Sequence, residues 1–95
     1  MRKITTQTVK AFLSSTNFKS GNDSVIVGMN ETCMLLHNNM IARMINGIIE
    51  VSLAGWNTNT TRDRLNGIPG CSIHTKYGTP YLNGNPINSS DWYKI

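Results

Sequence analysis

The stretch "MIARMINGIIEVSL", Met40–Leu53, carries the clearest structural signal in the chain. Asn46-Gly47 is the strongest short signal for a β-hairpin, because both central positions of a type I′ turn need positive φ. A two-residue turn there pairs Arg43 with Glu50, which we expect to form a cross-strand ion pair and not a catalytic pair. A shift of one residue would break this pairing and would also scatter the residues of the apolar face. Those residues are Met40, Ala42, Met44, Ile49, Val51 and Leu53.

Four short strands are expected around this turn, because runs of strand-forming residues are separated by two-residue breaks rich in asparagine. They are Ser24–Met29, Thr32–His37, Met40–Ile45 and Ile48–Leu53. A turn at Asn38-Asn39 would pair His37 with Met40. It would also add three residues to the apolar face, namely Cys33, Leu35 and His37.

An N-terminal helix is expected over Thr6–Asn17. Its buried stripe follows the i, i+3, i+4, i+7 spacing with Val9, Phe12, Leu13 and Thr16. Thr5 or Thr6 is expected to cap the helix, and "KSGND", Lys19–Asp23, is expected to end it in a loop. This helix would cover the apolar face of the strands.

The second half of the chain predicts a short helix followed by a hairpin. Thr60 and Asp63 fit a capping box, so we expect a helix over Thr61–Asn66 that ends with Gly67 in the left-handed conformation. Strands are expected at Cys71–Tyr77, Pro80–Leu82 and Asn85–Ile87, with turns at Gly78-Thr79 and Asn83-Gly84. The C-terminal Trp92, Tyr93 and Ile95 are expected to dock onto the rest of the protein.

The expected fold is therefore a single α+β domain over residues 1–95. It consists of an N-terminal helix packed on an antiparallel β-meander, a short second helix and a C-terminal β-hairpin.

The charge composition gives a first indication of partners. Nine Lys/Arg and five Asp/Glu residues give a formal net charge of +4, which favours a polyanionic partner such as a nucleotide or a nucleic acid. The basic residues are spread along the chain, so they also suit an ordinary solvated surface. No apolar run approaches the roughly 20 residues that a membrane helix needs, and no secretory pattern is found, so no membrane partner is expected.

Metal and catalytic sites are not expected. Cys33, His37, Cys71 and His74 are a possible zinc ligand set, but Cys71 and His74 would point to opposite faces of one strand. The two cysteines are expected to be free thiols in a reducing cytoplasm, and no cofactor is expected. The five carboxylates form no close pair, and no P-loop, G-x-G-x-x-G or H-E-x-x-H pattern occurs, so we expect a protein that is not an enzyme.

The polar run "GWNTNTTRDRLNG", Gly55–Gly67, has two interpretations. It is either a self-capped connector with Trp56 in the core, or a ligand site at a helix N-terminus, where unpaired amides attract phosphate. In the second interpretation hydroxyl and guanidinium groups bind phosphate, an aromatic ring stacks on a base, and the hairpin extends the site, with Tyr81 opposite Lys76. The predicted ligand-binding residues are Trp56, Thr58, Thr60, Thr61, Arg62, Arg64, His74, Lys76 and Tyr81.

The pattern Gly55-Trp56-x-Thr58-x-Thr60-Thr61-x-x-Arg64-Leu65-Asn66 resembles a motif of small proteins encoded by tailed bacteriophages. The stretch Leu36–Ala42 and a downstream lysine and aromatic residue, Lys76 and Tyr81, resemble the same proteins. Thr75 stands where a glutamine often precedes the lysine. The resemblance implies a phage protein in the host cytoplasm, and it is consistent with host takeover or anti-defence roles, including the capture of cyclic nucleotide signals.

We therefore expect a non-enzymatic phage protein that binds a nucleotide or another phosphate-bearing ligand, at a site completed by a homo-oligomer interface. The ligand would be a signal of host defence. Two alternatives remain: an interaction module that inhibits a host enzyme through exposed aromatic residues or a sheet edge, and a weak binder of single-stranded nucleic acid.

Overall fold

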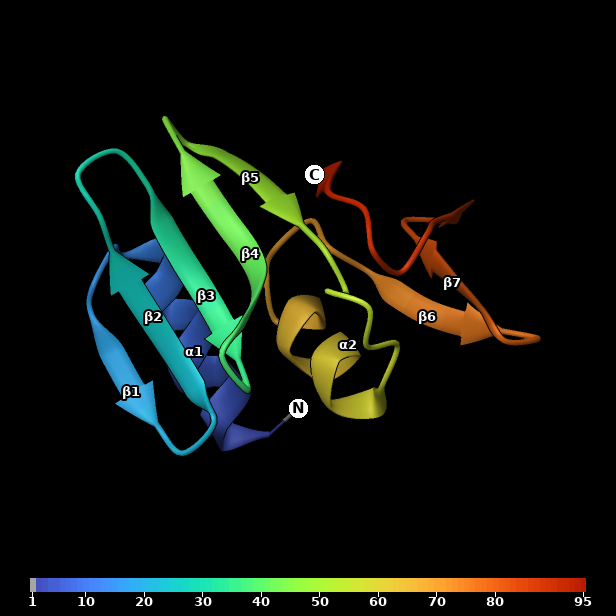
Figure 1. Ribbon diagram of the computed structural model, residues 1–95, viewed down its shortest axis with the longest axis horizontal. Coiled ribbons are helices and arrows are strands. Elements are labelled where there is room, and N and C mark those ends of the chain that lie inside the picture. The colour runs from blue at the N-terminus through green and yellow to red at the C-terminus, as the bar shows by residue number, and fades with distance from the viewer. Residues whose placement is uncertain (1) are drawn as a thin grey trace.

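The computed structural model describes residues 2–95 and has an α+β fold with two helices and two antiparallel sheets (Figure 1). The predicted fold class is confirmed. The elements are α1 (Lys3–Leu13), β1 (Phe18–Ser20), β2 (Asp23–Val27), β3 (Thr32–Leu36), β4 (Asn39–Ile45), β5 (Ile48–Val51), α2 (Asn59–Asn66), β6 (Ile73–Lys76), β7 (Thr79–Leu82), β8 (Asn85–Pro86) and β9 (Tyr93–Lys94).

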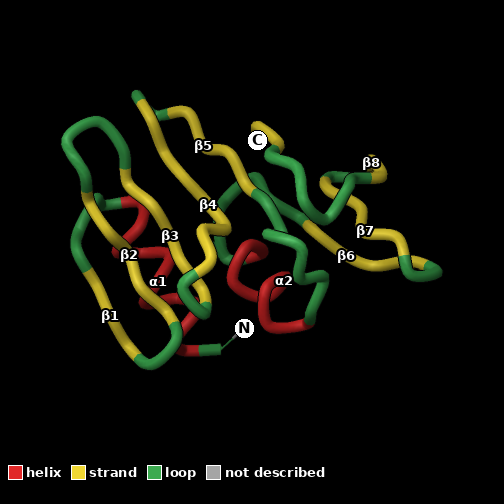
Figure 2. Tube along the Cα trace, viewed as in Figure 1, coloured by secondary structure: helices red, strands yellow, loops and turns green. Residues whose placement is uncertain are grey.

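The larger sheet has the strand order β1-β2-β3-β4-β5-β9, and the smaller sheet has the order β6-β7-β8. Helix α1 lies across the back of β2 and β3, and α2 lies between the two sheets (Figure 1). The smaller sheet extends to one side of α2, as the trace in Figure 2 shows. None of the helices within residues 2–95 is long and apolar enough to cross a membrane.

The core lies between α1 and the larger sheet and continues under α2. The most completely buried apolar side chains come from α1, α2, strands β2 to β5, and the loops after β5 and α2. They are Phe12, Val25, Met34, Ile41, Ala42, Val51, Leu53, Leu65 and Ile68. The core therefore joins the two halves of the chain.

Helix α1 starts three residues before the predicted helix Thr6–Asn17. Thr5 and Thr8 lie inside the helix and are fully buried, with their hydroxyls bound to Asp63 and to a carbonyl of the helix. The predicted cap at Thr5 or Thr6 is therefore wrong. The helix ends early because Ser15 adopts a positive φ of 51° just after it.

The segment after α1 was expected to be a loop, but it forms the edge strand β1. Lys19 pairs with Ser24, and Gly21, with a φ of 59°, makes the turn into β2. A three-residue strand is too short to show an alternating pattern, which is why the sequence does not reveal it.

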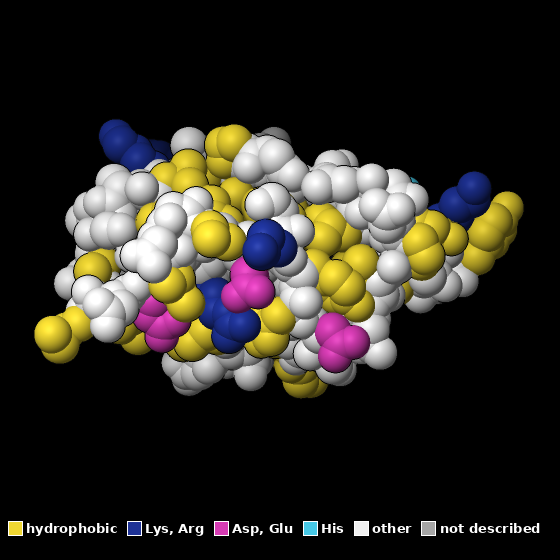
Figure 3. Space-filling view, turned by 90° about the horizontal axis from the view of Figure 1, so that it is seen from above, with side chains coloured by type: hydrophobic (Ala, Val, Ile, Leu, Met, Phe, Trp, Pro, Cys, Tyr) yellow, Lys and Arg dark blue, Asp and Glu magenta, His cyan; other side chains and the backbone are white. Residues whose placement is uncertain are grey.

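The β4–β5 hairpin has the predicted register. Asn46 and Gly47 have φ values of 52° and 78°, and Arg43 Nε lies 2.8 Å from Glu50 Oε1. Strand β9 pairs with β5, so Lys94 faces Glu50 from the other side. Figure 3 shows basic and acidic side chains adjacent to one another in the middle of one face of the molecule. The C-terminus docks as predicted, and the Trp92 ring packs 4.2 Å from the Arg43 guanidinium.

The predicted register between β3 and β4 is wrong. The turn is formed by His37 and Asn38, which have φ values of 51° and 65°, and not by Asn38-Asn39. Met34 and Leu36 belong to the core cluster, whereas of the predicted set Cys33 is buried outside this cluster and Leu35 and His37 are not buried. A β-bulge further along the strands shifts the pairing by one residue, so that Met34 pairs with Ala42 and Cys33 pairs with Arg43 and not with the predicted Met44. The extra residue on β4 is Ile41, whose side chain is only 1% exposed.

The β6–β7 turn also lies one residue earlier than predicted, which shifts the strand pairing by two residues. Tyr77 and Gly78 form the turn, with φ values of 52° and 81°, so Lys76 pairs with Thr79. Tyr81 faces His74 and not Lys76, and the two rings stack with their centroids 5.6 Å apart. The turn at Asn83-Gly84 is formed as predicted.

Candidate functional site

Helix α2 begins with a threonine cap, two residues earlier than the sequence predicts. Thr58 is the N-cap, and its Oγ1 accepts a hydrogen bond of 3.2 Å from the amide of Thr61. The predicted capping box of Thr60 and Asp63 is therefore wrong. Asp63 turns to the opposite side of the helix, where it accepts hydrogen bonds from Thr5 and Arg64.

Arg64 lies at the centre of a buried polar cluster that joins α2 to α1 and β2. Its Nε lies 2.5 Å from one oxygen of Asp23, and its Nη2 lies 3.3 Å from the other. Its Nη1 donates to Thr5 and Asp63 at 2.8 and 3.0 Å. Because Arg64 is 4% exposed and four of its five N–H donors are bonded within this cluster, the predicted phosphate role is replaced by a structural one.

The C-terminal end of α2 is held by two further residues of the polar run Gly55–Gly67. The Asn66 side chain forms two hydrogen bonds with the backbone of Ile73 and so anchors β6 to the helix. Gly67 has a φ of −74° and not the predicted left-handed conformation. Glycine is needed there because a Cβ would lie 2.8 Å from methyl groups of Thr5 and Val9 in α1.

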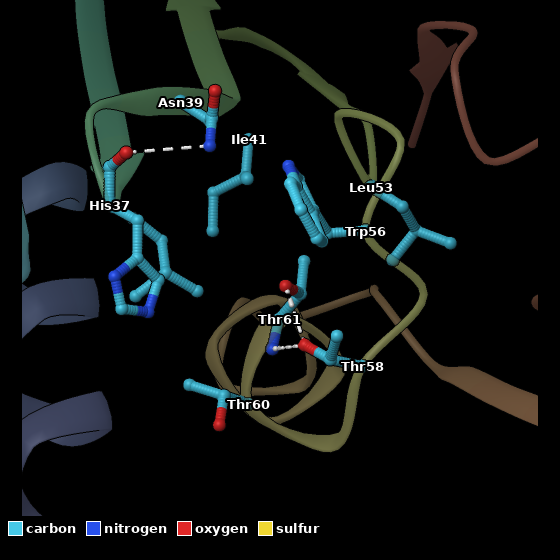
Figure 4. Close-up of a pocket in the computed structure, with 9 residues that line it drawn as sticks. His37, Asn39, Ile41, Leu53, Trp56, Thr58, Thr60 and Thr61 are labelled. Carbon is cyan, nitrogen blue, oxygen red and sulfur yellow. Dashed lines mark hydrogen bonds between the residues drawn. The ribbon is translucent and has the colours of Figure 1, made fainter.

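The other side of α2 forms one wall of an open cleft of about 520 Å³ (Figure 4). The floor of the cleft is apolar, and the polar groups lie around it. Leu36, Ile41 and Leu53 are at most 4% exposed and belong to the core. The remaining lining residues are His37, Asn39, Trp56, Thr58, Thr60 and Thr61.

Trp56 is 59% exposed, so the interpretation that buries this ring in the core is wrong. Ala54 and Gly55 have φ values of 53° and 82°, and the amide of Trp56 donates to the carbonyl of Leu53 at 2.8 Å. This tight turn directs the chain from β5 back toward α2 and places the indole over Thr61 at the edge of the cleft (Figure 4).

His37 and Asn39 form the opposite wall, and the sequence did not identify either of them as a site residue. His37 takes the first position of the β3–β4 turn, and its amide donates to the carbonyl of Asn22 at 2.8 Å. The imidazole of His37 and the indole of Trp56 lie on opposite sides of the cleft (Figure 4). One sequence signal did exist: Leu36–Ala42 and Gly55–Asn66, the two stretches that carry the phage resemblance, form the facing walls.

Arg62 does not line the cleft, although it belongs to the same turn of α2. Its guanidinium donates to the side-chain oxygens of Asn57 and Asn59, and Asn57 also accepts a hydrogen bond of 3.2 Å from Thr75. These partners are neutral amides, and no ion pair of Arg62 is found within residues 2–95. Arg62 therefore orders the loop before α2 and keeps an uncompensated positive charge.

The remaining predicted ligand residues lie elsewhere. His74, Lys76 and Tyr81 belong to β6 and β7 of the smaller sheet, and none of them lines the cleft. Thr75, the neighbour of both His74 and Lys76, is the residue that contacts the loop before α2. Because side chains alternate along a strand, His74 and Lys76 project from the opposite face.

The cysteines are buried free thiols. Burial raises the pKa of the Cys71 thiol to about 11. The pKa of Cys33 is raised by burial and by the neighbouring carboxylate of Glu31. Both thiols are therefore protonated at neutral pH and are poor nucleophiles. Within residues 2–95 no three His, Cys, Asp or Glu side chains come close enough to hold a metal ion.

Comparison with known proteins gives the origin of the chain. It matches no curated protein and no solved structure. Residues 1–94 match the family model described as Kyanoviridae Gp96 protein, which agrees with the phage origin that the resemblance implies. Because this match spans almost the whole chain, the protein belongs to the Kyanoviridae Gp96 family of phage proteins.

Proposed function

We propose that this phage protein binds a nucleotide in the cleft between Trp56 and His37 without transforming it. The observation that carries the proposal is the exposed indole of Trp56 beside an apolar floor and the first turn of α2. Large aromatic rings are usually buried in a small domain, so an exposed one at a cleft is a good candidate for ligand contact.

The planar part of the ligand would lie between the two rings. Stacking of a base on an aromatic side chain contributes roughly 1–3 kcal/mol. The cleft volume of about 520 Å³ falls within the usual range for small-molecule sites. Apolar contact with Leu36, Ile41 and Leu53 would add to the stacking energy.

A phosphate group would lie at the start of α2. The amides of Asn59 and Thr60 are the first two of the helix and have no acceptor earlier in it. The helix dipole favours an anion at this end, and the Thr60 hydroxyl lines the same wall. Thr58 and Thr61 would act indirectly, since their mutual hydrogen bonds fix the shape of this turn.

The composition of the cleft supports binding without catalysis. Its lining residues include no carboxylate, cysteine or lysine, and His37 is the only ionisable side chain among them. General acid–base or covalent catalysis normally needs at least two such groups within reach of each other.

The biological role that we infer is the capture of a nucleotide signal of host defence in the host cytoplasm. A small binding protein that does not turn over its ligand acts by lowering the free concentration of that ligand. The homo-oligomer that the sequence predicts stays a separate prediction.

The proposal is tested by isothermal titration calorimetry with adenine and guanine nucleosides, mononucleotides and cyclic nucleotides. We expect at least one of them to bind the protein and Trp56→Ala to weaken that binding by 10-fold or more. Trp92→Phe is the matched control, because Trp92 packs on Arg43 and not in the cleft. Binding that is unchanged in Trp56→Ala, or no binding of any ligand in the series, would refute the proposal.

A second candidate function, binding of single-stranded nucleic acid, is favoured by the smaller sheet. The stacked pair of His74 and Tyr81 lies near Lys76, and Tyr77 at the hairpin tip is 96% exposed. Aromatic and basic side chains side by side are typical of surfaces that bind single strands. Such binding would weaken steeply with salt and would be lost in Tyr81→Ala, while Trp56→Ala would leave it unchanged.

A further inference from the structure

We infer that the cleft selects a planar ligand with at most one negative charge, such as a nucleoside or a 3′,5′-cyclic mononucleotide, over nucleoside polyphosphates. This inference rests on the proposed function and specifies its ligand class. It is carried by the distribution of charge around the cleft, which is independent of the stacking geometry.

No lysine or arginine lines the cleft among the residues that the structure describes. Polyphosphate sites generally hold their ligand with Lys or Arg side chains or with a bound cation, because several negative charges must be balanced. The composition of the polar run Gly55–Gly67, with two arginines in the helix beside the cleft, would have indicated such a site.

Both arginines of this polar run have other contacts. Arg64 is neutralised in the buried cluster by Asp23 and Asp63. Arg62 keeps its charge, but it does not line the cleft, and two of its N–H groups are bonded to the amide oxygens of Asn57 and Asn59. Moving the Arg62 side chain into the cleft would break these two hydrogen bonds, which order the loop leading into α2.

The floor of the cleft disfavours charge as well. Leu36, Ile41 and Leu53 provide apolar contact for a ring or a sugar face, whereas burying a second or third phosphate charge beside them would be costly. The first amides of α2 provide favourable contacts for a single anionic oxygen, and nothing comparable is available for a chain of phosphates.

The test is a calorimetric series of adenosine, cyclic AMP, AMP and ATP, together with the guanine series, at 50 and 200 mM NaCl. We expect the nucleoside and the cyclic mononucleotide to bind within 10-fold of each other. The triphosphate should bind at least 10-fold more weakly than the cyclic mononucleotide. The affinity of the preferred ligand should change by less than 3-fold between the two salt concentrations.

A gain-of-charge variant sharpens the test. Thr60→Lys places a cation in the lining of the cleft, and Thr60→Gln is its uncharged control. We expect Thr60→Lys to raise the affinity for ATP at least 10-fold relative to Thr60→Gln, and the ratio of ATP affinity to adenosine affinity to rise by a similar factor.

The outcomes separate this inference from the proposed function. If ATP is the tightest ligand, with steep salt dependence and loss of binding in Trp56→Ala, the charge selectivity is overturned and the stacking site stands. If Trp56→Ala does not affect binding, or if no nucleoside or nucleotide binds, both are overturned. Equal ATP affinity in Thr60→Lys and Thr60→Gln also overturns the charge argument.

Discussion

The two arginines of helix α2 lie two residues apart and have opposite surroundings. Arg64 is buried among the carboxylates of Asp23 and Asp63, where it joins α2 to the rest of the core. Arg62 lies at the partly exposed side and contacts only asparagine side chains. The helix thus has a structural side that contains Arg64 and a cleft side that contains Thr58, Thr60 and Thr61.

This difference shows that residue type alone does not identify a binding residue. From the sequence alone, both arginines are suitable phosphate ligands. In the structure, however, Arg64 is needed to neutralise its carboxylate partners in the buried cluster. A buried charge with its partner removed is costly, whereas a partly exposed charge bonded to neutral groups is not. The following predictions test this division, from the largest expected effect to the smallest.

Asp23→Ala should destabilise the protein by about 3–5 kcal/mol, because it leaves the Arg64 charge buried without its main partner. Urea unfolding followed by circular dichroism measures the loss. Asp63→Ala is the matched control and should cost less, since the Asp63 side chain is 24% exposed. A loss below about 1 kcal/mol for Asp23→Ala would contradict the structural role of the cluster.

Gly67→Ala should cost about 1–3 kcal/mol, because a Cβ would overlap the methyl groups of Thr5 and Val9. The backbone φ of −74° is open to any residue, so the cost is purely steric. The same substitution made in a Val9→Ala background should therefore cost less. An equal cost in both backgrounds would show that α1 and α2 do not approach as closely as described.

Thr58→Ala should cost about 1 kcal/mol through loss of the N-cap, and Thr58→Ser should restore most of it. Thr60→Ala should change the unfolding free energy by less than about 0.5 kcal/mol, since Thr60 lies on the cleft side and does not cap the helix. Thermal denaturation ranks the three variants. A larger cost at Thr60 than at Thr58 would favour the capping box that the sequence predicts.

Cys71 should affect stability only at high pH. Burial raises its pKa from 9.0 to about 11, so the folded state holds the thiol proton more tightly than the unfolded state. The stabilisation is complete below pH 9 and is lost as the pH rises toward 11. Unfolding curves from pH 7 to 11 should show this decline, and Cys71→Ala should remove part of it. Identical pH profiles for the two proteins would contradict the assignment.

The fold was predictable where local signals and long-range pattern agree. The β4–β5 hairpin has an Asn-Gly turn, a facing ion pair and an alternating apolar face, and each of these requires the same register. The β3–β4 and β6–β7 registers were predicted wrongly because the turn signals in the sequence do not coincide with the turns in the structure. Their turns place His37 and Tyr77 at positive φ, where asparagine or glycine is normally expected.

The candidate site was predictable only in part. Trp56, Thr58, Thr60 and Thr61 were identified because the polar run exceeds what capping needs. The carboxylate partner of Arg64 was not predicted, because Asp23 is 41 residues away in the chain and no local pattern links the two residues. His37 was missed because its place opposite Trp56 depends on how α2 docks against the β3–β4 turn.

The division of α2 into a structural side and a cleft side is tested most directly by the unfolding free energies of Arg62→Ala and Arg64→Ala, measured side by side in urea. The account predicts a loss of about 3–5 kcal/mol for Arg64→Ala, which leaves Asp23 buried without a partner, and a loss of at most about 1 kcal/mol for Arg62→Ala, which removes two hydrogen bonds to neutral amides. Equal losses in the two variants, or a larger loss for Arg62→Ala, would contradict it.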